Sequence, residues 1–179
     1  LGPILFALYI NNIADDLNCS IVFYADDAQF IIKGSPNNIN RIIEAAERIL
    51  IKLKMKFSQL GLKINPSKTQ CMFVGSPTMT GNIDRNLTVN FEGHHISLSK
   101  NIKILGIILD ENLLYDKHIE SLCHKTKSIL IHLQRMKHKL DLETRKMIIE
   151  SLVLTKLNYC SLIYSKCSAT LKKEVQKVQ

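Results

Sequence analysis

The sequence lacks several features that would assign it to a special class of protein. No apolar run approaches the roughly 20 residues that a membrane-spanning helix needs, so no membrane partner is indicated. The five cysteines are odd in number and form no CxxC pair, so neither a disulfide framework nor a zinc ribbon is indicated, and a reducing compartment is favoured. With 7 glycines, 4 prolines, 46% apolar and 22% charged residues, the composition is that of an ordinary globular protein, neither collagen-like nor disordered.

The N-terminal residues do not indicate a secretory leader either. Residue 1 is Leu, and the apolar segment that follows has neither the basic region nor the small-residue cleavage site of a secretory signal peptide. We therefore expect a piece of a longer chain, long enough for one domain or two small ones.

Positive charge is unevenly distributed along the chain. Residues 1–113 carry 11 basic and 10 acidic side chains, whereas residues 114–179 carry 13 and 6, so most of the net charge of +8 lies in the last third. One interpretation is a solvated, lysine-rich helical face. The other is a surface for a polyanion such as nucleic acid, because clustered Lys and Arg neutralise phosphates and release counterions. Composition alone leaves both open.

The first 113 residues combine helical and extended patterns. Helices are predicted over 1–17 and 35–60, the second ended by Gly61. Apolar runs on either side of Asp26-Asp27 predict a hairpin over 21–32 with its turn at the two aspartates. Further strands are predicted over 70–74, over 87–91 and 95–98 as a hairpin, and over 102–109 with Gly106 inside the strand.

From residue 117 the hydrophobic period becomes that of helices. A first helix is predicted over 117–136, a second capped by Asp141, and a third capped by Ser168 that carries Leu171, Val175 and Val178. The change of period and of charge near residue 113 predicts a boundary there. The fold class is therefore α+β: a mixed domain over 1–113 followed by an all-helical domain over 114–179.

Asp26 and Asp27 are the strongest candidates for chemistry. A solvated turn would tolerate two adjacent carboxylates, but hairpin turns favour Asn-Gly or Asp-Gly, and the segment from Tyr24 to Ala28 has no glycine. We expect a buried hairpin tip that binds a divalent cation, because Mg²⁺ is usually held by one or two carboxylates plus substrate phosphates. Two such ions can stabilise the attacking and leaving oxygens of an in-line displacement.

Four motifs occur in a familiar order and spacing: Leu1-Gly2-Pro3, Tyr24-Ala25-Asp26-Asp27, the run from Gly61 to Thr69, and Leu105-Gly106-Ile107. With its motifs in this order, the sequence resembles reverse transcriptases, and the residues of the motifs are similar to those of non-LTR (LINE-type, jockey-like) retrotransposons. The resemblance covers nearly the whole chain. It implies the C-terminal part of a polymerase palm over 1–113, with an antiparallel sheet and helices, and a helical thumb over 114–179 truncated at its C-terminus.

The resemblance also implies roles for individual residues. Asp26 and Asp27 would be two of three metal-binding aspartates for Mg²⁺, with Asp26 the more demanding ligand, and the third would lie upstream of this chain. Lys68 matches a lysine proposed in polymerases to protonate the pyrophosphate leaving group, although a solvated loop lysine is the alternative. Tyr24, with Ala25, would pack beneath the primer end.

The later motifs would contact nucleic acid. The segment from Lys103 to Asp110, which contains Gly106, looks like the primer-grip strand, and Leu114, His118 and Ile119 match the start of the thumb. Four basic residues fall mostly off the apolar stripe of the first thumb helix and would contact phosphates: Lys125, Lys127, Arg135 and Lys137.

The resemblance implies an RNA-directed DNA polymerase (a nucleotidyltransferase) that extends a DNA primer with dNTPs on an RNA template during retrotransposition. Its partners would be template, primer, dNTP and the missing N-terminal palm and fingers of the same polyprotein, within the cell, in nucleus and cytoplasm. This fragment alone is expected to be inactive. The alternative is an inactive remnant that only binds nucleic acid or packs against a partner.

Other candidates have simpler interpretations. Asp15-Asp16 is expected at a solvated helix end, and Cys123 in the helical core. Cys123-His124 with Cys160 and Cys167 do not have zinc-site spacing. His94-His95 follows a hairpin turn and is expected at the surface.

Overall fold

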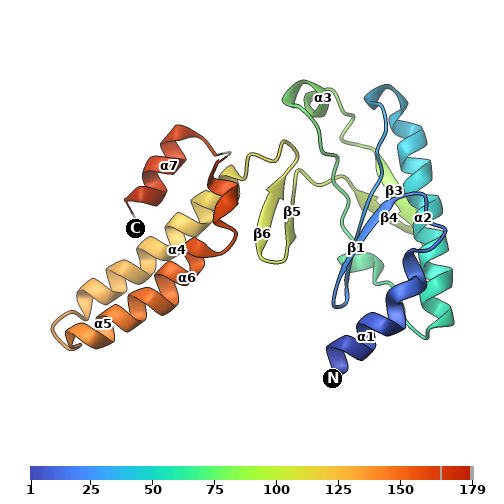
Figure 1. Ribbon diagram of the computed structural model, residues 1–179. Helices are drawn as coiled ribbons and strands as arrows, with labels where there is room; N and C mark the ends of the chain where they lie inside the picture. Colours follow the sequence, from blue (N-terminus) through green and yellow to red (C-terminus); the bar gives the residue numbers. More distant parts are fainter. Residues whose placement is uncertain (166, 178–179) are drawn as a thin grey trace. The chain divides into compact units, whose positions relative to one another are not determined.

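A computed structural model describes residues 1–165 and 167–177 as helices and small antiparallel sheets, which confirms the α+β class (Figure 1). The chain forms two compact units, residues 1–71 with 81–99 and residues 72–80 with 100–179. The second unit thus includes a hairpin over 101–110 besides the helices. The division into palm and thumb at residue 113 stays a prediction.

The first unit contains two separate strand pairs and one long helix. Its elements are α1 (Gly2–Ile10), β1 (Ser20–Tyr24), β2 (Asp27–Ile31), α2 (Ile39–Gln59), β3 (Thr88–Phe91) and β4 (His94–Ser97), with 3-10 turns η1 (Asn11–Ala14), η2 (Pro36–Asn38) and η3 (Pro66–Lys68). In the described part of the chain, β1 pairs only with β2, and β3 only with β4, both antiparallel. The predicted hairpin over 87–98 is therefore confirmed.

Helix α2 organises the core of this unit. Its apolar residues recur at helical spacing, so they form a stripe that is buried on folding. Leu50 packs with Val89 and Phe91 of β3, beside which α2 lies (Figure 1). Leu53, in the same stripe, packs with Ile10 in a second cluster. Gly61 ends the helix with a φ of 67°, as predicted, because a left-handed residue after a helix is most easily supplied by glycine.

The second unit is mainly helical. Its elements are α3 (Pro77–Gly81, whose last residue belongs to the other unit), β5 (Asn101–Ile104), β6 (Ile107–Asp110), α4 (Asp116–Arg135), α5 (Leu142–Ile148), the π-helical segment η4 (Ile149–Leu154), α6 (Thr155–Asn158), the 3-10 segment η5 (Ser161–Ser165) and α7 (Ala169–Gln176). None of the helices in the described part of the chain has the length and apolar character needed to span a bilayer.

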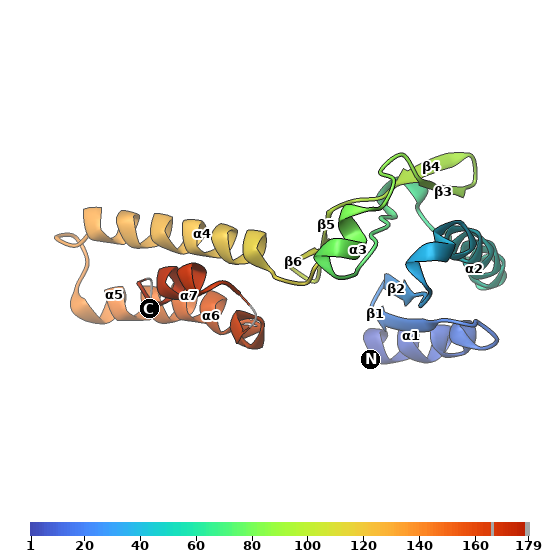
Figure 2. The same ribbon diagram turned by 90° about the horizontal axis from the view of Figure 1, so that it is seen from above.

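Helices α4, η4, α6 and α7 of this unit contribute to one core. α5, η4 and α6 form a continuous run that lies beside α4, and α7 packs against α4 (Figure 2). Cys123 lies in this core at 5% exposure, as predicted, and burial raises the pKa of its thiol. The two predicted caps are confirmed: Asp141 accepts from the N–H of Thr144 at 2.7 Å, and Ser168 from that of Leu171 at 3.3 Å.

The single strand predicted over 102–109 is wrong. The segment is a hairpin in which Ile104 pairs with Ile107, and Leu105 and Gly106 form its turn. Both turn residues have positive φ, 47° and 87°, which suits the twist of a two-residue hairpin loop. Gly106 therefore makes the turn instead of interrupting a strand.

Two other predictions were also wrong. Residues 70–74 form no strand, because a strand requires a hydrogen-bonded neighbour and only Cys71 has one, in an isolated bridge to Leu98. The first helix stops at Ile10 and continues as the 3-10 turn η1, not as one helix to residue 17. The predicted apolar contact of Val178 lies outside the described residues.

Candidate functional site

The β1–β2 hairpin presents the two candidate carboxylates. Its last pair is Tyr24 with Asp27, so the turn consists of Ala25 and Asp26, one residue earlier than predicted. Ala25 has a φ of 50°, a left-handed conformation that costs an L-residue roughly 1–3 kcal/mol. Residues with strained backbone persist only where the surrounding structure holds them in that conformation, and they are frequent at functional sites.

The prediction of a buried tip was wrong. Asp26 and Asp27 are exposed, and three apolar residues of the same hairpin are exposed too: Val22 at 58%, Tyr24 at 62% and Ile31 at 57%. In the described residues, β1 and β2 pair only with one another, and a two-stranded hairpin cannot bury both of its faces. Some of the apolar side chains that predicted burial are therefore exposed. The exposed residues of α1 extend this apolar character: Leu1, Ile4, Leu5, Leu8 and Tyr9.

The two carboxylates are available to a ligand. Neither forms a hydrogen bond or an ion pair with the described part of the chain. Their oxygens are the hard ligands that Mg²⁺ prefers, so the chemistry of the donors fits this ion. Within the described residues, however, no group of three or more Asp, Glu, His and Cys side chains forms a metal-binding cluster. The pair is therefore at most part of a coordination shell.

Lys68 ends the short turn η3, which follows Asn65. The side chain of Asn65 accepts the N–H of Ser67 at 3.0 Å, and its carbonyl accepts the hydroxyl of Thr69 at 2.9 Å. These contacts fix the backbone of the turn while the Lys68 side chain remains exposed. No hydrogen bond or ion pair joins Lys68 to Asp26 or Asp27, so the structure does not bring these three predicted residues together.

The β5–β6 hairpin, which carries Gly106, is attached to the helices of its own unit. The hydroxyl of Tyr159 donates to the carbonyl of Leu105 in the turn at 2.8 Å. The N–H of Ile108 donates to Nδ1 of His118 on α4 at 3.4 Å. Burial, followed by the nearby charge of Lys125, lowers the pKa of His118. Tyr159 had no sequence signal, because its partner is 54 residues away.

Asp110 orders the segment between this hairpin and α4. Its carboxylate accepts the backbone N–H groups of Asn112 at 3.0 Å, Leu114 at 3.1 Å and Tyr115 at 2.5 Å. The segment needs this support because Leu113 and Tyr115 have positive φ, 55° and 62°. Asp110 is thus a structural carboxylate that the sequence did not single out.

The four basic residues predicted to contact phosphates are all exposed, but they differ in their surroundings. Lys127 on α4 forms an ion pair with Glu174 on α7, and this contact raises the pKa of the lysine. Hydrogen bonds from Lys127 and Lys177 lower the pKa of Glu174 to about 2. Lys125, Arg135 and Lys137 have no ion-pair partner in the part of the chain that the structure describes. Of the four basic residues, these three therefore carry a charge that no acidic side chain in the described residues offsets.

The remaining candidates match their simpler interpretations. Asp15 and Asp16 are exposed after η1, and the ammonium of Lys56 donates to the carbonyl of Asp15. His94 and His95 are exposed on β4. All five cysteines are free thiols.

Comparison with known proteins gives one match. Residues 1–109 match the family model described as reverse transcriptase (RNA-dependent DNA polymerase). The match covers 109 of 179 residues, including the hairpin tip, Lys68 and Gly106. No curated protein and no solved structure matches the chain.

Proposed function

Because the chain belongs to the reverse transcriptase family, we propose that it is the part of an RNA-directed DNA polymerase that carries the Asp26-Asp27 tip. The parent enzyme would transfer a nucleotidyl group from a dNTP to a primer 3′-hydroxyl opposite an RNA template. The observation that supports this most is the position of two adjacent carboxylates at a strained hairpin turn within the matched residues, without a hydrogen-bond or ion-pair partner among the residues that the structure describes.

Asp26 and Asp27 would hold Mg²⁺ together with a third carboxylate supplied from upstream in the parent chain. When bound, Mg²⁺ lowers the barrier by neutralising charge on the attacking and leaving oxygens. Asp26 lies in the turn itself and Asp27 opens β2, so the hairpin fixes the spacing of the two carboxylates. This positioning is the contribution of the protein, because phosphoryl transfer depends on alignment and on charge stabilisation.

Other residues of the first unit would act around the tip. Tyr24 and Ala25 would pack beneath the primer end. Both residues are exposed, so they are accessible to a primer. Lys68 would give a proton to the pyrophosphate leaving group once the substrates are bound. Its ammonium is exposed on a turn whose backbone is fixed by Asn65, which allows the side chain to reach a ligand while its base stays in place.

The second unit would hold the template–primer duplex. The β5–β6 hairpin with Gly106 would contact the primer strand, and Lys125, Lys127, Arg135 and Lys137 would contact phosphates. Contacts of this kind position a duplex without reading its sequence. Lys127 would contribute least, since Glu174 already offsets its charge.

The exposed apolar residues around the tip support the proposal that a missing palm segment covers them. Palm and fingers would come from the same polyprotein, that of a non-LTR retrotransposon, acting in the nucleus and cytoplasm. An inactive, nucleic-acid-binding remnant is the second candidate. It is favoured by the fact that only two carboxylates meet at the tip, with no larger metal-binding group in the described residues.

Templated primer extension by the parent polyprotein tests the proposal. Wild-type protein should incorporate labelled dNTP on an RNA template with Mg²⁺, and Asp26→Asn should abolish synthesis with template–primer affinity nearly unchanged, because the amide keeps the shape but not the charge. Asp15→Asn is the matched control, at an exposed aspartate outside the tip. Extension by the Asp26→Asn protein at near the wild-type rate would contradict the metal assignment, and absence of extension by the wild type would favour the remnant.

A further inference from the structure

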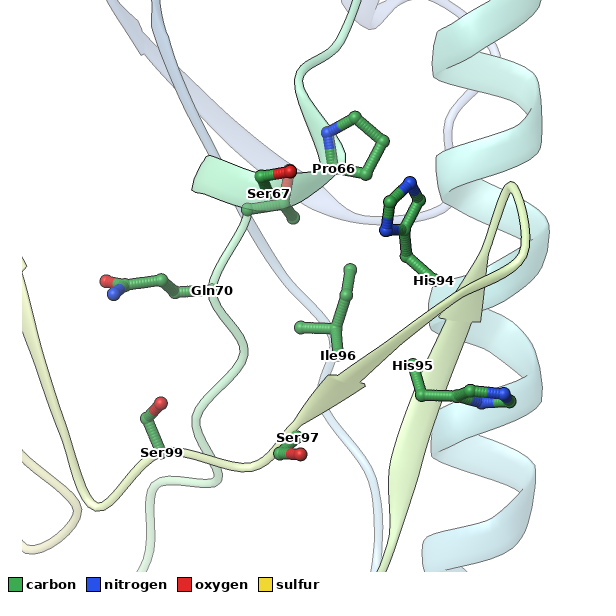
Figure 3. A pocket seen from close by; sticks show the side chains of 9 residues that line it. Pro66, Ser67, Gln70, His94, His95, Ile96, Ser97 and Ser99 are labelled. Carbon is green, nitrogen blue, oxygen red and sulfur yellow. The ribbon is translucent and has the colours of Figure 1, made fainter.

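A polar hollow of about 350 Å³ lies in the first unit, on the edge of β4 that has no strand partner (Figure 3). One wall is the segment that starts at η3, and the other is β4 with the residues that follow it. Most of its lining is polar: Ser67, Thr69, Gln70, His94, His95, Ser97 and Ser99. None of the residues that line it is acidic.

The two walls are fixed to one another by the backbone. Cys71 and Leu98 form a parallel bridge, and the N–H of Ser99 donates to the carbonyl of Cys71 at 2.8 Å. At the other end, the side chain of Asn65 holds the N–H of Ser67. The hollow is therefore built on a preorganised backbone and does not depend on a loose loop.

The hollow offers donors that are not otherwise used. The hydroxyls of Ser67, Ser97 and Ser99 and the amide of Gln70 have no side-chain hydrogen bond in the described part of the chain. A hydroxyl or amide can donate to an anion without a change of protonation. The carboxylate nearest in sequence, Glu92, is paired with the ammonium of Lys54, so its charge is offset. These features suit an anionic ligand.

His94 and His95 are adjacent but have different surroundings. The ring of His94 faces Pro66 and Ser67 across the hollow, whereas the ring of His95 points to the opposite side (Figure 3). Nδ1 of His95 contacts the side-chain oxygen of Asn90, and the side-chain amide nitrogen of Asn90 donates to Glu47 at 3.1 Å. The two rings cannot chelate one metal ion from opposite sides of a strand. A metal is thus the less suitable ligand.

We propose that this hollow binds a phosphate group of a polynucleotide strand, with His94 and the serine hydroxyls as donors. Neutral imidazole still donates one ring N–H, and several weak donors around an open hollow suit a phosphodiester, which stays exposed to solvent on one side. Lys68, at the end of η3, is exposed and does not line the hollow, so the proposed contacts come from the neutral donors alone. The site is separate from the Asp26-Asp27 tip and does not require polymerase activity.

Binding of a labelled RNA–DNA hybrid to the 179-residue chain tests this site. His94→Ala should weaken the affinity about three- to tenfold, the effect of one net hydrogen bond. Asn40→Ala is the control, at an exposed polar residue of α2 that does not line the hollow, and it should leave the affinity unchanged. Equal losses for the two variants, or no loss for His94→Ala, would overturn the proposal. Because no synthesis is measured, failure here leaves the proposed polymerase function untouched.

A second measurement identifies the source of the phosphate. In amide NMR spectra of the chain, the hybrid should shift the signals of Ser67, Ser97 and Ser99, and His94→Ala should reduce these shifts while the rest of the spectrum shows an intact fold. Inorganic pyrophosphate is titrated in parallel. If pyrophosphate shifts these amides and the hybrid does not, the hollow binds the free anion and the polynucleotide assignment is wrong.

Discussion

At the scale of single residues, two carboxylates have structural roles that charge counting does not reveal. Asp110 and Glu174 are ordinary acidic residues in the sequence, yet each accepts several hydrogen bonds in the structure. Asp26 and Asp27, in contrast, accept none from the described chain. The difference separates carboxylates that stabilise the fold from those that are free to bind a ligand.

Replacing Asp110 should destabilise the chain. Its carboxylate accepts three backbone N–H groups in a partly buried segment, and hydrogen bonds to a charged acceptor contribute about 1.5–3 kcal/mol each. We expect Asp110→Ala to lower the free energy of unfolding by roughly 2–4 kcal/mol in urea, since water replaces part of the lost contacts. Asp110→Asn keeps one acceptor oxygen and should lose clearly less. Equal losses for both variants would contradict this role.

Glu174 should make stability depend on acid pH. Its pKa is lowered to about 2 in the folded state from a usual value near 4.5. A depressed folded pKa stabilises the fold above the unfolded value, and this contribution disappears as the pH falls from about 4.5 towards 2. Unfolding of wild type and Glu174→Gln should therefore differ above pH 5 and converge near pH 2. A difference that is constant across this range would show that the ion pairs with Lys127 and Lys177 do not stabilise the fold.

At the scale of elements, the sequence predicted what depends on local pattern. The stripe of α2, its end at Gly61, the β3–β4 hairpin and the caps Asp141 and Ser168 were all predictable, because each rests on periodicity or on residues within one turn. The β5–β6 hairpin was not, since Gly106 fits a strand interior as well as a turn. The exposure of the Asp26-Asp27 tip was also missed, because an apolar pattern does not show whether a covering segment is present.

Tyr159 attaches the turn of the β5–β6 hairpin to the helices, beside the hydrogen bond between Ile108 and His118. Tyr159→Phe removes the hydroxyl that donates to the carbonyl of Leu105 while keeping the ring. We expect hydrogen exchange of the turn amides to accelerate about two- to tenfold, the effect of one net hydrogen bond. Exchange in α7 serves as the internal reference and should not change. Unchanged protection of the turn would mean that the β5–β6 pairing alone holds it.

At the scale of the whole molecule, positive charge is distributed unevenly along the chain. Most of the excess charge lies in residues 114–179. The structure separates Lys127 and Lys177, which pair with Glu174, from Lys125, Arg135 and Lys137, which have no ion-pair partner among the described residues. Sequence alone could not make this division, because Lys127 and Glu174 are 47 residues apart and meet only when α7 packs on α4.

Salt dependence should separate the two groups of cations. Affinity of the chain for an RNA–DNA hybrid should be nearly independent of sequence and fall with salt, with a log–log slope of about −0.9 per neutralised phosphate on B-form DNA as a guide. Replacing Lys125, Arg135 and Lys137 with alanine should flatten this slope and leave the fold intact. Lys127→Ala should change the slope less and loosen α7 instead. Binding that is indifferent to salt would mean that the lysines form only a solvated face.

The central claim is that the Asp26-Asp27 tip is a metal-binding site, and Mn²⁺ tests it directly in the 179-residue chain. As a paramagnetic substitute for Mg²⁺, Mn²⁺ should broaden the amide signals of residues 24–28 at concentrations that leave Asp15 and Asp16 sharp. That second pair of adjacent carboxylates is a built-in control, since the ammonium of Lys56 lies at Asp15 and disfavours a cation. Asp26→Asn should abolish the broadening at the tip. Equal broadening at both pairs, or broadening that survives Asp26→Asn, would contradict the account.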